Sequence, residues 1–296
     1  MTAPEPTPAH PLRGTLLVLI SAACFGTTLI FTQRALDSGA TLAALLAYRY
    51  VFGAVMLCAV AGGIGAVRDV GARKWSLLTL GGLAQTAIAG LSVASLQFIP
   101  AASVAFLFYT YPTWVAALAI VRRSEHVDAY KILALLLSLA GIVTIVGNPL
   151  ATKLDPRGIA LALAAAVIYA LLIPWLGKIQ AGLKPAAATT WIALGAAICF
   201  VIGALVMKAP LFPPTRSMLL YSGALALIPT TLAFTTFLAG LAALGPVRTS
   251  IVSTVEPFWT ALLAGLVLGQ SVGPRTWIGG AMIATAMLVL QRKPAT

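Results

Sequence analysis

The stretch that decides the fold is YPTW at residues 111–114, because it returns as EPFW at residues 256–259. Both copies stand in the middle of an apolar run, about 145 residues apart. Pairs in the same register are Pro112 with Pro257, Trp114 with Trp259, Ala116 with Ala261, Ala119 with Ala264, and Val127 with Val272. At a shift of about 144, Arg13-Gly14 meets Arg157-Gly158, Phe25 meets Tyr169, and Arg34 meets Lys178. The chain is therefore predicted to consist of two related halves.

The composition indicates a membrane protein. Of the 296 residues, 60% are hydrophobic and 9% are charged, whereas soluble domains carry about 25% charged residues. The apolar residues fall into ten runs of about 18 to 25 residues, which is long enough to cross a bilayer as helices. We expect these spans at 14–36, 41–61, 75–98, 101–121, 130–147, 157–179, 187–206, 217–243, 246–268 and 275–291. A β-barrel is not expected, because the runs lack period-two alternation.

The ten spans divide into two repeats of five helices, predicted at residues 13–150 and 151–292. The polar, Pro-rich residues 1–12 are expected to form a disordered tail. Basic residues stand singly or in small groups between the spans, so the net charge of +12 fits a topology signal and not nucleic-acid binding. Their bias predicts that both chain ends are cytoplasmic, in a bacterial inner membrane. An odd number of helices per repeat inverts the second repeat, which is a common plan of secondary transporters.

The sequence offers no cofactor or metal chemistry. Cys24, Cys58 and Cys199 fall within spans and are interpreted as packing residues. His10 and His126 lie in the tail and in a loop, so no histidine is available inside the membrane. Walker-type loops, HExxH motifs and paired intramembrane carboxylates are also absent from the sequence. We therefore expect no cofactor and keep an intramembrane enzyme only as a remote alternative.

Several stretches resemble those of a known transporter family. They are the small-residue helix from Ser21 to Arg34, the arginine in Tyr48-Arg49-Tyr50, and the passage from Thr231 through Leu244-Gly245-Pro246 to Glu256-Pro257. In this order they resemble the drug/metabolite transporter superfamily, EamA type, and the aromatic-rich middle is similar to YddG-type amino-acid exporters. Members often end helices 4 and 9 with a glutamate after Leu-Gly. Glu125 fits the first place, whereas Gln270 stands in the second. The resemblance implies a cavity between helices 1, 3 and 4 of one half and helices 6, 8 and 9 of the other.

Glu256 is the strongest candidate for a site residue, because it is the only acidic residue deep in a predicted span. It lies about eleven residues, or about 16 Å, into its span and so close to the bilayer midplane. An ionisable group there costs roughly 2.5 kcal/mol or more, so it should face a cavity or a partner. Ser253 and Thr260 share its face at helical spacing. The alternative is a neutral glutamate bonded to backbone that Pro257 frees. Its equivalent in the first half is Tyr111.

Arg49 and four intramembrane prolines are candidate gate residues. Arg49 lies about eight residues, roughly 12 Å, into the second span. It is interpreted equally as a binder of a substrate carboxylate or gate ion pair, and as a side chain that snorkels to the outer interface. Pro112, Pro174, Pro229 and Pro257 each remove a backbone donor, which makes a hinge or a plain kink satisfied by Ser and Thr neighbours. The recurrence at 112 and 257 favours a gate there.

Aromatic and small polar side chains are expected to complete the binding cavity, since ligand sites are mostly apolar with a few polar groups. The candidate aromatic residues are Phe25, Tyr111, Tyr169, Trp175 and Phe234. The candidate polar residues are Thr28, Gln85, Ser92 and Thr110. For any one aromatic residue, core packing or lipid contact is the commoner explanation.

The sequence thus predicts a secondary active or facilitative exporter of small amphipathic metabolites. An amino acid with a hydrophobic side chain suits the mixed apolar and hydroxyl lining best. A proton-coupled exporter of lipophilic cations, in which Glu256 binds drug and proton in turn, is the main alternative. The expected partners are the small-molecule substrate and the lipid bilayer. Gly141, Gly279 and Gly280 fit internal packing or a homodimer equally.

Overall fold

Every regular element in the part of the chain that the structure describes is a helix. The computed structural model describes residues 11–147, 154–211, 215–269 and 272–291. The helices are α1 (Pro11–Asp37), α2 (Leu42–Ala61), α3 (Ile64–Arg68), α4 (Arg73–Ser76), η1 (Leu77–Gly81), α5 (Gly82–Ser95), α6 (Ala101–Phe108), α7 (Tyr111–Val121), α8 (Ala129–Val146), α9 (Pro156–Ile179), α10 (Pro185–Val206), α11 (Arg216–Leu225), η2 (Ala226–Leu232), α12 (Ala233–Leu244), α13 (Pro246–Val252), η3 (Ser253–Val255), α14 (Glu256–Leu268) and α15 (Pro274–Gln291). The elements η1 and η2 are π-helical and η3 is a 3-10 turn.

Within the described residues, nine helical stretches are long and apolar enough to cross a membrane. They are Leu12–Asp37, Leu42–Ala61, Arg73–Ser95, Ser103–Val121, Ala129–Val146, Pro156–Ile179, Pro185–Val206, Arg216–Leu244 and Pro246–Val267. The last expected span corresponds to a shorter apolar helix, Pro274–Leu290. The protein is thus a multi-pass membrane protein. The expected disordered tail falls almost wholly outside the described residues, and so does Gln270.

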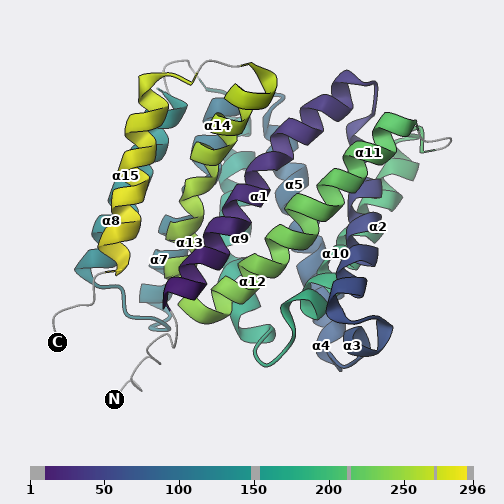
Figure 1. Cartoon of the computed structure of the whole chain (residues 1–296), viewed down its shortest axis with the longest axis horizontal. Coiled ribbons are helices and arrows are strands. Elements are labelled where there is room, and N and C mark those ends of the chain that lie inside the picture. The colour runs from purple at the N-terminus through teal and green to yellow at the C-terminus, as the bar shows by residue number, and fades with distance from the viewer. Residues whose placement is uncertain (1–10, 148–153, 212–214, 270–271, 292–296) are drawn as a thin grey trace.

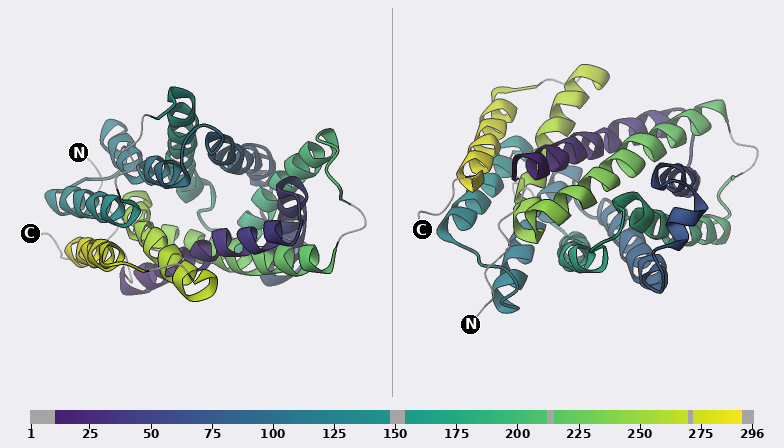
Figure 2. Two further views of the ribbon diagram at one scale, coloured as in Figure 1. Left: turned by 90° about the horizontal axis from the view of Figure 1, so that it is seen from above. Right: turned by 60° about the horizontal axis from the view of Figure 1, so that its bottom comes forward.

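The helices form one bundle whose first and last helices start and finish at the same end (Figure 1). At one edge α8 and α15 pack side by side, and at the other α2 packs against α10 and α11 (Figures 1 and 2). Helix α1 crosses the bundle and contacts both α12 and α14. Helices α1 and α9 run in opposite directions, so their last turns lie at opposite ends of the bundle (Figure 1).

Small residues allow the closest helix contacts. This is typical of membrane proteins, because the hydrophobic effect does not drive helices together in lipid and close backbone packing takes its place. A Cβ added at Gly195 of α10 would lie 1.9 Å from the Leu78 carbonyl oxygen. Gly141 and Gly279 face each other between α8 and α15, where a Cβ would lie 2.7 Å or less from the partner's carbonyl oxygen. Gly280 packs on Phe258. Gly141, Gly279 and Gly280, which fitted internal packing or a homodimer equally in the sequence, thus pack against helices of the same chain. A homodimer stays a prediction.

Polar caps fix several helix starts at the rims of the bundle. Asp128 accepts a hydrogen bond from the Lys131 amide (2.8 Å) at the start of α8. Asp155 accepts one from the Arg157 amide at the start of α9 and pairs with the Arg157 guanidinium. That side-chain hydrogen bond lowers the pKa of Asp155 below its usual value. Such caps satisfy backbone donors that the first helical turn leaves free.

Candidate functional site

The fourth and ninth predicted spans are both broken near their middle, at equivalent positions. In the first, two residues separate α6 from α7, and Pro112 sits in the first turn of α7. In the second, the 3-10 turn η3 separates α13 from α14, and Pro257 sits in the first turn of α14. Helix α13 packs against α7, so the two broken spans meet. Both paired prolines thus stand directly after a helix break, and their gate role is left for a proposal.

Glu256 stands at the break of the second span and is half-buried, in the first turn of α14. The hydroxyl of Tyr109, which stands at the break of the first span, approaches the Glu256 carboxyl group. The Tyr111 hydroxyl approaches the Ser253 side chain and, at 3.4 Å, the Ser250 carbonyl oxygen. Tyrosines of one half therefore reach the break of the other half.

Aromatic rings from α6, α7, α9 and α12 and from the break between α6 and α7 surround this contact. They form what we call the ring cluster: Phe108, Tyr109, Tyr111, Tyr169 and Phe237. The Tyr111 and Tyr169 rings meet edge to face at 4.7 Å, and Phe108 stacks on Tyr169 at 5.6 Å. Tyr169 in turn stacks on Phe237 of α12 at 6.4 Å. Ring faces carry negative potential and attract cations, so a carboxyl group beside rings is suited to an ammonium group.

The hydroxyl groups expected to line the site also satisfy the backbone around the breaks. Ser253 donates to the Thr249 carbonyl oxygen (2.9 Å), and Thr260 donates to that of Glu256 (3.0 Å). Thr110 donates to the Leu107 carbonyl oxygen (2.6 Å) and accepts a hydrogen bond from the Trp114 indole (3.3 Å). These hydroxyl protons are therefore already used, and what each oxygen still offers a ligand is its acceptor capacity.

Helix α1 brings its predicted residues against α12 and α14. Phe25 meets Phe234 of α12 edge to face at 5.0 Å. One residue on, Gly26 allows the close crossing of α14, since a Cβ there would lie 3.1 Å from the Thr260 hydroxyl oxygen. Thr28 is half-buried on the next part of α1. Helix α1 thus contacts α12 through Phe25 and α14 at Gly26, and no side-chain contact of Phe25 or Thr28 to Glu256 is defined among the described residues.

Gln85, Ser92 and Arg49 belong to a different set of contacts. Gln85 on α5 donates to the Tyr50 hydroxyl (2.9 Å), whereas Ser92 is half-buried near the end of α5. Arg49, whose neighbour is Tyr50 on α2, donates through Nε to the Thr230 hydroxyl (2.9 Å) of η2. The partners of Gln85 and Arg49 thus lie on α2 and η2, and the cavity role of Gln85 and the gate role of Arg49 stay predictions.

Arg49 is 7% exposed, so its side chain is held inside the bundle. Its partner Thr230 donates to the Leu225 carbonyl oxygen (2.8 Å), four residues before Pro229. Thr231 does the same for the Ala226 carbonyl oxygen (2.8 Å). A proline frees such carbonyls. Thr230 and Thr231 therefore bond to the carbonyl oxygens near the kink at Pro229, as expected if this proline forms a plain kink with Ser or Thr neighbours.

A cavity of about 480 Å³ lies between α7, α9 and α12, at the end of the bundle where α1 begins. Its lining residues are Val115, Leu118, Ala119, Arg122, Ser124, Glu125, Pro174, Trp175, Gly177, Lys178, Leu241, Ala242, Gly245 and Pro246. Val115 stands one helical turn after Tyr111, and Leu241 stands one turn after Phe237. One turn is about 5.4 Å, so two rings of the cluster lie about one helical turn beyond the cavity lining, which itself contains no residue of the ring cluster. Pro174 and Trp175 are the predicted site residues that line it.

The mouth of the cavity is held by an ion pair whose role the sequence did not reveal. Glu125 Oε1 lies 2.8 Å from Lys131 Nζ, and both side chains are largely buried. Lys131 also donates to the His126 carbonyl oxygen. Glu125 Oε2 accepts a hydrogen bond from the Val247 amide (3.2 Å) at the start of α13. The glutamate that the family pattern locates at the end of helix 4 thus ties the first half to the second.

Sequence reasoning left Tyr109, Phe108 and Phe237 out of the site. The available signal was their position, because Tyr109 and Phe108 directly precede the predicted Thr110 and Tyr111. In contrast, the repeated tryptophans of the opening motif point outward: Trp114 is 44% exposed and Trp259 is 38% exposed. The motif therefore marks the breaks, and its tryptophans face away from the site.

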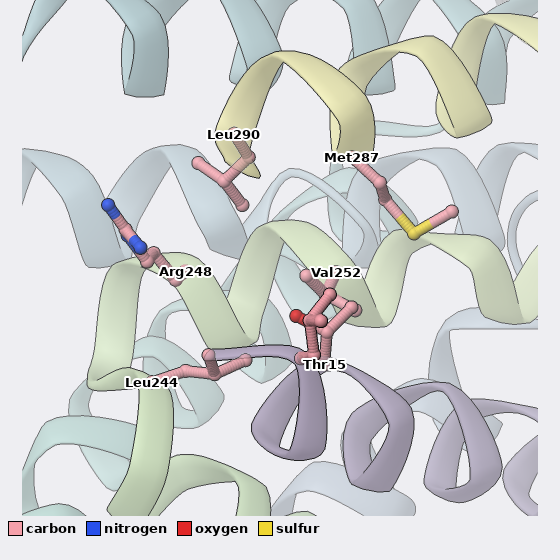
Figure 3. A pocket seen from close by; sticks show the side chains of 7 residues that line it. Thr15, Leu244, Arg248, Val252, Met287 and Leu290 are labelled. Atoms are coloured by element: carbon pink, nitrogen blue, oxygen red, sulfur yellow. The ribbon is translucent and has the colours of Figure 1, made fainter. Parts of the chain in front are cut away.

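A smaller cavity of about 150 Å³ lies between the start of α1, the start of α13 and the end of α15. Thr15, Leu244, Val252, Met287 and Leu290 converge on it, with Arg248 at its side (Figure 3). It is mostly apolar, and its lining contains no residue of the ring cluster.

Two broken spans that meet within a bundle of apolar helices, with a half-buried acid at one break, are typical of multi-pass membrane transporters. The chain belongs to the EamA-like transporter family, which it matches twice, over residues 12–147 and 156–292. These two matches confirm the two repeats that the opening motif predicted.

The individual relatives agree with this class. The "Uncharacterized inner membrane transporter YicL" of Salmonella typhimurium is 26% identical over 193 residues, which is 64% of this chain and 64% of that protein. An "Uncharacterized transporter" of Archaeoglobus fulgidus is 26% identical over 281 residues, covering 95% of this chain and 97% of that one. A solved crystal structure is similar with a TM-score of 0.80 at 19% identity, over 94% of this chain and 96% of the other, which shows the fold alone.

Proposed function

We propose that this protein exports small amphipathic metabolites, most simply amino acids with a hydrophobic side chain, across a bacterial inner membrane by alternating access. The observation that carries the proposal is Glu256, a half-buried carboxyl group at a helix break beside Tyr109 and the ring cluster. In this proposal the acid binds the substrate ammonium group and the rings contact its apolar side chain. The cavity below the rings is the path to one side of the membrane.

The proposed architecture is ten spans in two inverted repeats, with both chain ends cytoplasmic. Two family matches of similar length support the repeats. The opposite directions of α1 and α9, the first helices of the two matches, support the inversion (Figure 1). The breaks at Pro112 and Pro257, which recur at equivalent positions, support a gate role for these prolines. Inverted repeats that rock about a central site are a common basis of alternating access.

A lipophilic cation is the second candidate substrate, and the same observation supports it. A carboxyl group beside aromatic rings favours any organic cation. In that case proton and drug compete for Glu256, so drug binding weakens on acidification. A zwitterion held in addition by apolar and hydroxyl contacts should respond less to pH.

Transport in proteoliposomes tests the proposal. Vesicles loaded with an unlabelled hydrophobic amino acid should take up the same labelled amino acid by exchange. The analogue without the amino group should not compete, whereas the matching amine without the carboxyl group should compete weakly. Efficient exchange of a lipophilic cation with no amino-acid exchange would overturn the amino-acid proposal in favour of the second candidate. Protein-free vesicles are the control.

A further inference from the structure

A single hydrogen bond closes α1 onto α14 at the end of the bundle away from the cavity. Arg34 Nη2, near the end of α1, donates to the Val267 carbonyl oxygen (2.8 Å) in the last turn of α14. The last four carbonyls of a helix have no intrahelical partner and carry the negative end of the helix dipole. A cation is therefore a favourable partner there, and this contact holds together two helices that cross at Gly26.

The internal repeat identifies the residues at the opposite end of the bundle that correspond to Arg34 and to the end of α14. Arg34 of α1 is equivalent to Lys178 of α9 in the sequence. In the register of the paired prolines, a shift of 145 residues, Val267 at the end of α14 corresponds to Arg122 at the end of α7. The pair that corresponds to Arg34 and the end of α14 is thus Lys178 and the end of α7.

The second pair is not bonded in the structure. Lys178 and Arg122, at the ends of α9 and α7, both line the 480 Å³ cavity. Among the described residues, the Lys178 side chain has no hydrogen-bond or ion-pair partner, although α7 and α9 pack against each other. At one end of the bundle, Arg34 thus bonds α1 to α14. At the opposite end, the equivalent residue Lys178 lines an open cavity.

We propose that Arg34 and Lys178 are the two alternating gate residues of the transport cycle, which rests on the proposed function. In the state seen here, Arg34 binds the end of α14 and Lys178 leaves the cavity open. In the other state, Lys178 donates to the Arg122 carbonyl oxygen at the end of α7 and closes the cavity. Arg34 then releases α14 and the opposite end opens. The two contacts are equivalent in the repeat and exclude each other.

Thiol labelling of a cavity residue tests the gate without any substrate. In a background without Cys24, Cys58 and Cys199, Ala119→Cys places a reporter in the cavity lining. Arg34→Gln removes the contact at the tied end, so the cavity should close more often and labelling by an impermeant reagent should slow. Lys178→Gln should keep the rate at or above that of the parent. Exposed charged contacts are worth up to about 1 kcal/mol, so we expect a two- to fivefold change.

Matched variants separate gating from loss of charge or of fold. Lys184→Gln removes an exposed cation at the same end as Lys178 and should leave labelling unchanged. Arg34→Lys keeps a cation and should label like the parent, and it replaces Arg34→Gln if that variant does not fold. The double variant Arg34→Gln/Lys178→Gln should label faster than Arg34→Gln alone.

Unchanged or faster labelling of Arg34→Gln, or an equal effect of Lys184→Gln, overturns the gate. That result is distinguishable from a failure of the proposed function. If labelling responds as expected but amino acids are not exchanged, the gate proposal holds and the amino-acid proposal fails. If amino acids are exchanged but labelling does not respond, the amino-acid proposal holds and the gate proposal fails.

Discussion

The two broken spans share one backbone design and differ in their chemistry. Each breaks just before a proline that opens the next helix, at Pro112 and at Pro257. The residue before the proline is Tyr111 in the first and Glu256 in the second, and Tyr111 is fully buried whereas Glu256 is half-buried. The first break supplies rings and the second supplies an acid. Substitutions that alter the backbone should therefore act alike in the two halves, and substitutions of side chains should not.

The largest difference is expected between Glu256→Gln and Tyr111→Phe. A hydrogen bond to a charged group is worth about 1.5–3 kcal/mol, so Glu256→Gln should lower amino-acid exchange by about tenfold to a hundredfold. Tyr111→Phe removes one long neutral contact, worth about 1 kcal/mol or less, and should cost at most about fivefold. Initial exchange rates at equal amounts of reconstituted protein measure both. Near-parental exchange by Glu256→Gln from pH 5 to 8 would assign the glutamate a purely structural role.

A medium effect is expected when the contact between the two breaks is removed. Tyr109→Phe deletes the hydroxyl that lies beside Glu256 and should lower exchange by about five- to tenfold, because a polar contact worth about 1–1.5 kcal/mol is lost. Tyr169→Phe is the matched control, since the Tyr169 ring stays in the cluster and no hydrogen bond to Glu256 is removed. Equal losses in the two variants would show that ring polarity matters and the contact does not.

The smallest difference is expected between Pro112→Ala and Pro257→Ala. Both prolines occupy the first turn of a helix, where a missing N–H costs little. Replacing either should change the unfolding free energy by only about 0.5–1 kcal/mol, and the two variants should differ by less than that. Thermal unfolding in detergent measures the stability, and exchange rates measure the gate. Strongly unequal effects would mean that the two breaks are not equivalent hinges.

Site residues could be predicted where a physical rule depends only on a residue and its neighbours in the sequence. An acid in the middle of an apolar run is costly, so Glu256 stood out without any coordinates. The same holds for Pro112 and Pro257, because a proline inside a span must interrupt its hydrogen bonds. Tyr109 and Phe237 were missed, since nothing in the local pattern distinguishes a ring that faces the site from one that faces lipid.

Other assignments depended on which surfaces meet. Gln85 and Arg49 carry the polar groups expected of a lining, yet they bond to Tyr50 and Thr230. Glu125 looked like a family feature, and its partners Lys131 and Val247 come from the next helix and from the other half. Hydrogen bonds between spans need the relative rotation of the helices, which no periodicity within one span supplies.

The sequence by itself determined the membrane class, the approximate position of each span and the two repeats. These follow from hydropathy and from internal similarity, which are properties of the linear chain. The tertiary structure alone decided that α13 meets α7, that Tyr109 reaches Glu256, and that the cation of α1 is bound whereas its equivalent on α9 lines an open cavity. The physical reason is that two nearly equivalent halves pack as one asymmetric body, and the bonds made at one end need not be made at the other.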